Sequence, residues 1–180
     1  MDWKNVFFLG VLSGAVLSVA PAYSSGGIPT KVLIRVVSKD AKVIGSGVGG
    51  AAVRIVNART GETLAQGKQE GGTGETDRIM VTPRGRDSVV YGTPGAAFFL
   101  AEIGLERPTQ VEIRVEAPLG FPQALQRGSK TITLIPGKDI AGEGVIIELD
   151  GLIVDIVTPA ATGAIRKGGQ LPVKADVRML

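Results

Sequence analysis

The chain has 180 residues, with 20 Lys and Arg against 17 Asp and Glu, and it contains neither cysteine nor histidine. Without these two residue types its own side chains cannot build a Ser-His-Asp triad, a cysteine nucleophile, or a zinc or haem site. The net charge of +3 is too small and too evenly spread to indicate nucleic-acid binding, and the 26 glycines and 10 prolines are typical of many short strands joined by turns.

Residues 1–22 have the pattern of a signal peptide for secretion. An apolar run from Val6 to Val19 follows Lys4 and leads to a small-x-small cleavage pattern at Ala20–Ala22. This run is shorter than the ~20 residues that span a bilayer, so a cleaved signal is favoured over an uncleaved membrane anchor. The sequence therefore predicts an exported protein, periplasmic or extracellular at the cell surface, with a flexible leader over residues 23–30.

Alternating apolar and polar residues predict short strands in the first half of the chain. Gly45–Gly50 is a glycine-rich turn between two strands, and Arg59–Glu62 is the tight turn of a hairpin. Residues 67–76 contain many glycines and are expected to form an exposed loop. The strands predicted here are Lys31–Val37, Ala52–Asn57, Thr63–Gln66, Asp77–Thr82 and a short segment at Ser88–Tyr91.

The second half alternates with the same regularity. The apolar members of the strand Thr109–Glu116 share one face, so we expect Val111, Ile113 and Val115 in the core. Because no segment after residue 22 shows helical periodicity over two turns, residues 31–158 are predicted to form an all-β, antiparallel β-sandwich. Its other strands are Ala97–Ile103, Lys130–Ile135, Val145–Leu149 and Leu152–Val157, the last two divided by a turn at Asp150–Gly151.

Residues 159–180 are interpreted as a linker followed by a β-hairpin tail. Val154–Val157 and Leu171–Val177 are two apolar-alternating runs around a turn rich in glycine and proline. A lone hairpin is only marginally stable in water, so it needs a sheet to join. The alternatives are docking on this chain's own sandwich and pairing of edge strands with another envelope protein or a second copy. The candidate partner-binding edge is Leu171, Val173, Ala175 and Val177.

Gly50–Gly67 resembles the first hairpin of the carboxypeptidase-regulatory-like, or transthyretin-like, β-sandwich family, in which a Thr-Gly-Glu turn brings the chain back. The later turn and the closing strands of that family are similar to Gly72–Gly74, Val111–Gly120 and Ile132–Gly137. The tail from Val154 to Val177 resembles the opening hairpin of bacterial immunoglobulin-like modules. The resemblance implies an immunoglobulin/transthyretin-like sandwich that serves as a spacer, adhesion unit or accessory domain without catalysis of its own.

Gly45–Gly50 also satisfies the G-x-G-x-x-G fingerprint of dinucleotide-binding sites. That site needs a helix directly after the glycines, whereas Val53, Ile55 and Val56 are mediocre helix formers. A cluster of turn glycines is therefore the favoured interpretation, and a nucleotide-binding enzyme fragment is the alternative.

Two loop clusters of charged residues are candidate ion sites. Arg78, Arg84 and Arg86 flank one long loop and form a candidate anion-binding loop, with solvent-exposed surface arginines as the alternative. The acidic residues of the preceding loop have oxygens that suit calcium, but their spacing fits no known calcium loop and a solvated turn is favoured. They are Glu70, Glu75 and Asp77.

The sequence therefore predicts an exported, non-enzymatic β-sandwich module with a structural, adhesive or protein-binding role at the cell envelope. It offers no catalytic, cofactor-binding or metal-binding residues, and we expect neither a nucleic acid nor a small-molecule substrate as its partner. The alternative is an accessory subunit of a larger periplasmic or membrane-associated complex.

Overall fold

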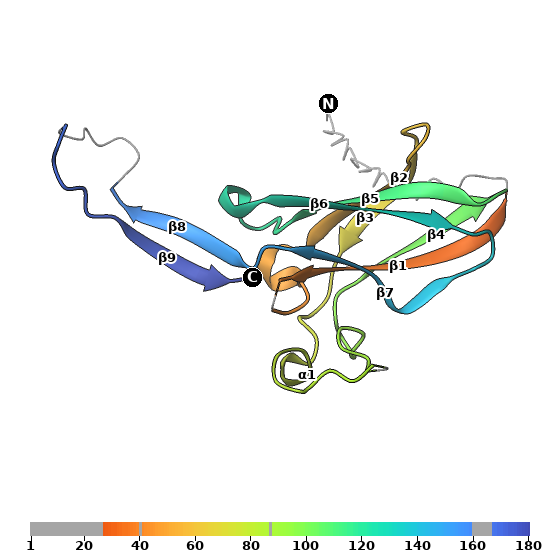
Figure 1. Ribbon diagram of the computed structural model, residues 1–180, viewed down its shortest axis with the longest axis horizontal. Coiled ribbons are helices and arrows are strands. Elements are labelled where there is room, and N and C mark those ends of the chain that lie inside the picture. The colour runs from red at the N-terminus through yellow and green to blue at the C-terminus, as the bar shows by residue number, and fades with distance from the viewer. Residues whose placement is uncertain (1–26, 40, 87, 160–166) are drawn as a thin grey trace, which may run out of the picture.

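The computed structural model describes residues 27–39, 41–86, 88–159 and 167–180. Two β-sheets pack face to face, a third sheet of two strands projects from one end, and a small lobe lies beneath (Figure 1). The predicted all-β sandwich is confirmed. The predicted signal peptide at 1–22, residues 23–26 of the predicted leader and residues 160–166 of the predicted linker and tail lie outside the described residues.

The first sheet has three strands in the order β4-β1-β7, and the second has four in the order β3-β2-β5-β6. All neighbours in the second sheet are antiparallel, but β1 pairs parallel with β7, which differs from the wholly antiparallel sandwich that we predicted. The strands are β1 (Ile28–Ser38), β2 (Ala51–Asn57), β3 (Thr63–Gln69), β4 (Phe99–Leu105), β5 (Thr109–Ala117), β6 (Gln126–Leu134) and β7 (Ile140–Leu149), with short 3-10 helices η1 (Ser46–Val48) and η2 (Pro122–Ala124).

The main core lies between the two sheets, and the two-residue periodicity of the strands determines which side chains enter it. On β5, Val111, Ile113 and Val115 are buried, with exposed fractions of 0%, 0% and 1%. On β2, Val53 and Ile55 are buried on the same inward face. These predicted core positions are confirmed.

A lobe formed by the described residues between 70 and 98 covers the outer face of the first sheet. Its only helix among the described residues is α1 (Thr76–Met80), although we predicted a strand over Asp77–Thr82. A single helical turn buries one apolar side chain, Ile79, and leaves its neighbours in solvent. Ile79 packs in a second, smaller core with Val37 of β1, so this segment contributes no strand to either sheet.

A partly buried polar contact holds the lobe to the sheet. The Glu143 carboxylate on β7 accepts hydrogen bonds from the backbone N–H groups of Val90, Tyr91 and Gly92 at 2.7, 3.0 and 3.3 Å. The buried Arg35 of β1 donates to the carbonyl oxygens of Gly142 and Glu143 at 2.7 and 2.6 Å. Desolvation lowers the pKa of Arg35, and the nearby charge of Glu143 opposes that shift. Arg35 therefore fixes the bend of β7 that presents Glu143 to the lobe.

Gln69, the last residue of β3, completes the hydrogen bonding of β1 where β4 no longer covers it. Its side chain is fully buried. The amide oxygen accepts from the backbone N–H of Val36 at 2.7 Å, and the amide nitrogen donates to the carbonyl oxygens of Val36 and Ile44 at 2.9 and 2.8 Å. This one side chain replaces a stretch of missing strand, because a buried backbone group needs a partner.

Candidate interaction surface

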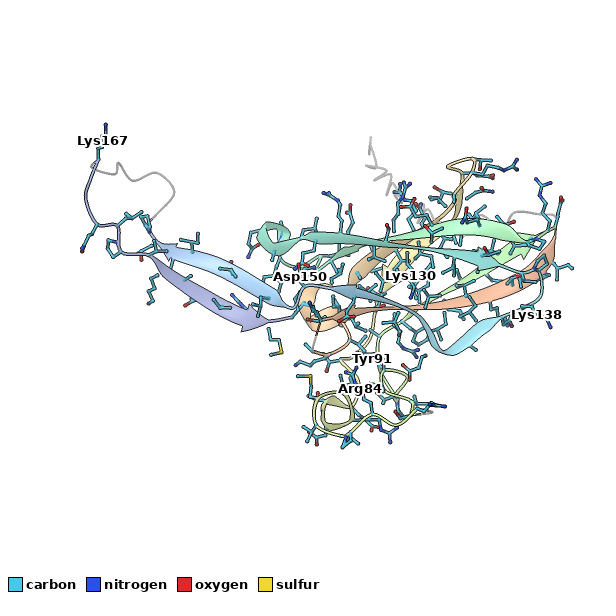
Figure 2. All side chains as sticks on the ribbon, in the orientation of Figure 1. Arg84, Tyr91, Lys130, Lys138, Asp150 and Lys167 are labelled. Atoms are coloured by element: carbon cyan, nitrogen blue, oxygen red, sulfur yellow. The ribbon has the colours of Figure 1, made fainter. Side chains whose placement is uncertain are left out.

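The last two strands form a hairpin that projects from the end of the sandwich. β8 (Leu152–Thr158) pairs antiparallel with β9 (Lys174–Met179), and neither strand joins a sandwich sheet. Figure 1 shows the hairpin extending away from both sheets, and Figure 2 shows Lys167 at its far end. The sequence places residues 152–158 in the sandwich, whereas the structure pairs them with β9.

The register of the hairpin separates its side chains into an apolar face and a polar face. Leu152 lies opposite Met179, Val154 opposite Val177, and Ile156 opposite Ala175. The members from each strand are two positions apart, so they share one side of the two-stranded sheet. They alternate with charged residues on β9, and with Ile153, Asp155 and Val157 on β8. The apolar face is exposed to solvent: the exposed fractions are 55%, 48%, 67%, 59% and 54% for Leu152, Val154, Ile156, Val177 and Met179.

The hairpin contacts the sandwich at its base. The backbone N–H of Leu180 donates to the carbonyl oxygen of Gly151 at 2.9 Å, and the side chains of Leu180 and Ile153 are buried. On the polar face, Asp155 accepts a hydrogen bond from Gln123 of η2 at 2.6 Å. The base is therefore fixed to the sandwich, while the rest of the apolar face has no cover.

Asp155 connects both strands of the hairpin to the loop at η2. Its carboxylate accepts from the Arg178 guanidinium at 2.8 Å, and that guanidinium lies 5.2 Å from the centre of the Phe121 ring. Hydrogen bonds from Gln123 and then from Arg178 lower the pKa of Asp155 below the usual range of an aspartate. The ionised carboxylate is therefore the form that the docked hairpin favours.

The four residues of the predicted partner-binding edge are all exposed. Ala175 and Val177 lie on the apolar face of β9, and Leu171 and Val173 precede this strand with exposed fractions of 42% and 61%. The runs Val154–Val157 and Leu171–Val177 were predicted to pair, and the pairing of Val154 with Val177 confirms it.

The three arginines of the candidate anion-binding loop lie in the lobe, but they do not converge on one point. Arg78 of α1 forms an ion pair with Glu75 at 3.4 Å. Arg84 lies 5.7 Å from the centre of the Tyr91 ring and donates to the Tyr91 hydroxyl at 3.5 Å, and the two residues lie next to each other in Figure 2. Arg78 and Arg84 line a shallow hollow of about 280 Å³, whose lining does not include Arg86.

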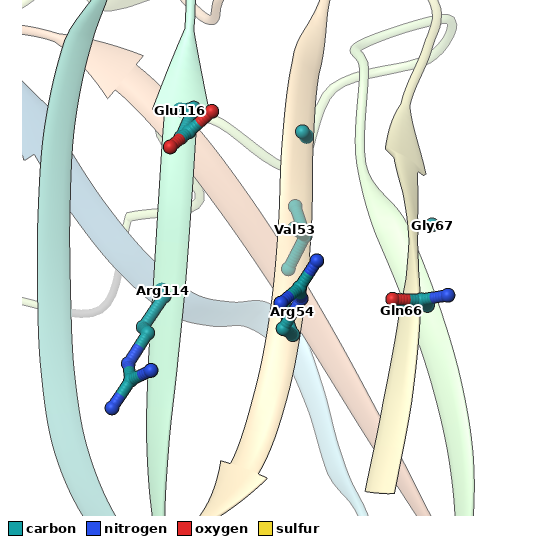
Figure 3. Close-up of a pocket in the computed structure, with 7 residues that line it drawn as sticks. Val53, Arg54, Gln66, Gly67, Arg114 and Glu116 are labelled. Atoms are coloured by element: carbon teal, nitrogen blue, oxygen red, sulfur yellow. The ribbon is translucent and has the colours of Figure 1, made fainter. Parts of the chain in front are cut away.

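A larger hollow of about 530 Å³ lies on the outer face of the second sheet (Figure 3). Arg54 on β2 lies directly between Arg114 on β5 and Gln66 on β3, and all three line the hollow. Arg114 is already paired with Glu112 at 2.7 Å. The hollow is open and carries charges of both signs, so nothing in it selects a particular ligand.

The glycine fingerprint at Gly45–Gly50 is a turn. The segment after it is strand β2, where a dinucleotide site needs a helix. Gly49 has a φ of +90°, and a Cβ atom there would clash with the backbone nitrogen of Gly120. The glycines thus let this turn approach the loop after β5, where the N–H of Gly120 donates to the carbonyl of Val48 at 2.9 Å.

The acidic residues of the neighbouring loop do not gather around a cation site either. Glu70 forms an ion pair with Lys68 at 2.8 Å, and Glu75 forms one with Arg78. Among the residues that the structure describes, no group of His, Cys, Asp and Glu could hold a metal ion. Over the same residues, no helix is long and apolar enough to cross a membrane.

Sequence reasoning missed part of the apolar face and the contacts at its base. Leu152 and Met179 extend the face toward the sandwich, and the spacing of Leu152, Val154 and Ile156 is a signal that could have identified it. The docking of Asp155 on Gln123 joins residues that are 32 positions apart, so no local pattern could have revealed it.

Comparisons with protein-family models, curated proteins and solved structures find no match.

Proposed function

We propose that this chain is an exported, non-enzymatic β-sandwich module that binds another protein at the cell envelope. The single observation that supports the binding role most strongly is the exposed apolar face of the β8–β9 hairpin. Isolated apolar side chains are common on protein surfaces, but contiguous ones on a projecting element are typical of interaction sites. The apolar run that follows Lys4 and the cleavage pattern at Ala20–Ala22 support export.

The shape of the hairpin also supports protein binding. One face carries Asp155, Asp176 and Arg178, while the opposite face is apolar from Leu152 to Ile156 on β8 and from Ala175 to Met179 on β9. Antiparallel sheets that pack on a core through one face and expose the other to solvent have the same division of side chains. A partner that supplies an apolar sheet face would bury the apolar side and leave the charged side in water.

A second candidate role is that of an accessory subunit in a larger envelope complex. The observation that favours it is the hairpin's attachment, because Ile153 and Leu180 fix its base while its far end extends into solvent. An arm fixed in this way holds its binding face at a defined distance from the sandwich. Both roles use the same apolar face. An accessory subunit would keep its partner stably, whereas a binding module would bind its partner transiently.

Export is tested on the protein isolated from cells. We expect a mature N-terminus at Tyr23, measured by intact-mass spectrometry, and recovery in the periplasmic or extracellular fraction. A protein that retains Met1 and remains in the cytosol would exclude the proposed location.

The binding role is tested by cross-linking in cells. A photo-cross-linking residue at Ile156 should capture a specific envelope protein, and the substitution Val154→Lys beside it should abolish that capture. The matched control is the same cross-linker at Val81, an equally apolar residue that is 75% exposed in the lobe. Equal capture at both positions would contradict a binding role for the hairpin face.

A further inference from the structure

We propose that the free edge of β9 pairs antiparallel with β9 of a second copy of this chain, so that two hairpins form one four-stranded sheet. The inference rests on the proposed function in that the hairpin is the binding element. It concerns the backbone edge of the hairpin, whereas the envelope partner would use its apolar face. The two interactions can therefore be tested separately.

The backbone groups of β9 that point away from β8 can be identified from one hydrogen bond. The N–H of Leu180 donates to the carbonyl oxygen of Gly151, so the backbone of Leu180 faces β8. Bonded and non-bonded positions alternate along an antiparallel strand. Met179, Val177 and Ala175 therefore direct their N–H and C=O groups outward, and β9 is the last strand of its sheet.

The charges of β9 select one register for this pairing. When Val177 faces Val177 of the second copy, Asp176 faces Arg178 of that copy, and the same contact is repeated by symmetry. In this register Ala175 faces Met179, so outward-pointing positions meet and form about six backbone hydrogen bonds, two for each bonded pair. A shift that places Asp176 opposite Asp176 also places Lys174 opposite Arg178, and like charges directly opposite each other are destabilising.

Asp176 is the residue that gains most from this arrangement. It lies directly opposite Asp155 in the hairpin, and Arg178 pairs with Asp155 at 2.8 Å. Within the described part of the chain, no cation forms an ion pair with Asp176. The second copy brings its own Arg178 to Asp176, so the charge pattern of β9 is complementary to itself.

The edge of β8 does not offer the same match. The face of β8 opposite its apolar side has one charged residue, Asp155, and Arg178 of the same chain already pairs with it. Two copies paired through β8 would therefore gain no new pair of opposite charges. The loop at η2 also lies beside β8, where Gln123 binds Asp155. Pairing through β9 instead leaves the contact between Gln123 and Asp155 in place, and it puts the two sandwiches at opposite ends of the four-stranded sheet.

The test compares proline substitutions on the two edges of the hairpin. Proline at position 177 removes an outward N–H and no bond to β8, so Val177→Pro should weaken self-association about 100-fold while the hairpin persists. The matched control is Val154→Pro, which removes an outward N–H from the β8 edge and should leave association unchanged. Sedimentation equilibrium of the purified chain over a concentration series measures both, and circular dichroism checks folding.

A charge exchange provides the second arm of the test. Asp176→Arg places a guanidinium opposite Arg178 of the other copy and should raise the dimer Kd at least about tenfold. The double substitution Asp176→Arg with Arg178→Asp restores opposite charges across the interface and keeps a cation opposite Asp155, so it should recover the dimer. A dimer that is insensitive to the substitutions at positions 177 and 176, or equally sensitive to Val154→Pro, would overturn the inference.

The outcomes also separate this inference from the proposed function. A chain that is monomeric at every concentration, yet is cross-linked to an envelope protein through Ile156, refutes the β9 dimer alone. A dimeric chain that is retained in the cytosol refutes the proposed function alone.

Discussion

At the scale of single residues, Gln69 carries an unusual share of the hydrogen bonding. Gln69→Leu keeps the size of the side chain but leaves the N–H and C=O of Val36 and the C=O of Ile44 without these partners. The C=O of Val36 still accepts from the backbone N–H of Ile44 at 3.1 Å, so two buried groups are left unpaired. Because each such group costs about 1–3 kcal/mol, we expect the free energy of unfolding to fall by about 2–6 kcal/mol. Urea denaturation measures the loss, and Gln66→Leu on the exposed face of β3 is the control.

Ile113 and Glu112 offer a comparison between neighbouring residues on opposite faces of β5. Ile113 is fully buried, so Ile113→Ala should lower the free energy of unfolding by about 2–5 kcal/mol. Glu112 lies on the opposite face and forms a surface ion pair with Arg114, so Glu112→Ala should leave the free energy of unfolding nearly unchanged. Urea denaturation of both variants makes the comparison, and equal losses at the two positions would contradict the facing of this strand.

The hairpin base should loosen in acid because of Asp155. Its pKa is lowered in the folded protein, so its contribution to docking is complete above the ordinary pKa of an aspartate and disappears as the pH falls through the lowered value. We expect the amide of Leu180 to lose protection from hydrogen exchange over that acidic range. In Asp155→Asn the protection of the Leu180 amide should be weaker at neutral pH and should no longer change over the acidic range. If the protection in this variant still falls in acid, another group causes the effect.

At the scale of elements, the lobe should detach from the sheet more readily than the sandwich unfolds. Glu143→Ala removes the acceptor for three backbone N–H groups at Val90, Tyr91 and Gly92. We expect trypsin to cleave at Arg84 and Arg86 faster, while the urea midpoint of the sandwich changes little. Glu148→Ala, an exposed glutamate on the same strand, is the control. Unchanged cleavage would show that the small apolar core alone holds the lobe.

The strands were predictable wherever one face is buried and the other is wet. Alternation identified β5 and β2 correctly, because a shift of one residue in either strand would move all its apolar side chains from the core to solvent. It failed at α1, where a single buried residue, Ile79, is compatible with a strand or one helical turn. It also placed Leu152–Val157 in the sandwich, because an apolar face has the same pattern whether or not a second sheet covers it.

At the scale of the whole molecule, the contacts that join elements were beyond prediction from the sequence. Arg35 and Glu143 lie 108 positions apart, and Gln69 and Val36 lie 33 apart, so their hydrogen bonds exist only once the topology is formed. The candidate surface was predicted in part: Ala175 and Val177 were identified, while the face they share with Leu152 and Met179 depends on the register of the hairpin.

The parallel pairing of β1 with β7 has a mechanical consequence. Val32 aligns with Ile140 and Ser38 with Leu149, so a pulling force applied at Ile28 and at Leu149 runs along the two strands in opposite directions. From Ile34 to Ser38, where the register with Val145–Leu149 is unbroken, the hydrogen bonds then resist in shear together, because parallel ladders are evenly spaced. By contrast, a force applied at Asn57 and Thr63 would peel β2 from β3 one bond at a time. Single-molecule stretching should therefore give a much higher rupture force for the first geometry.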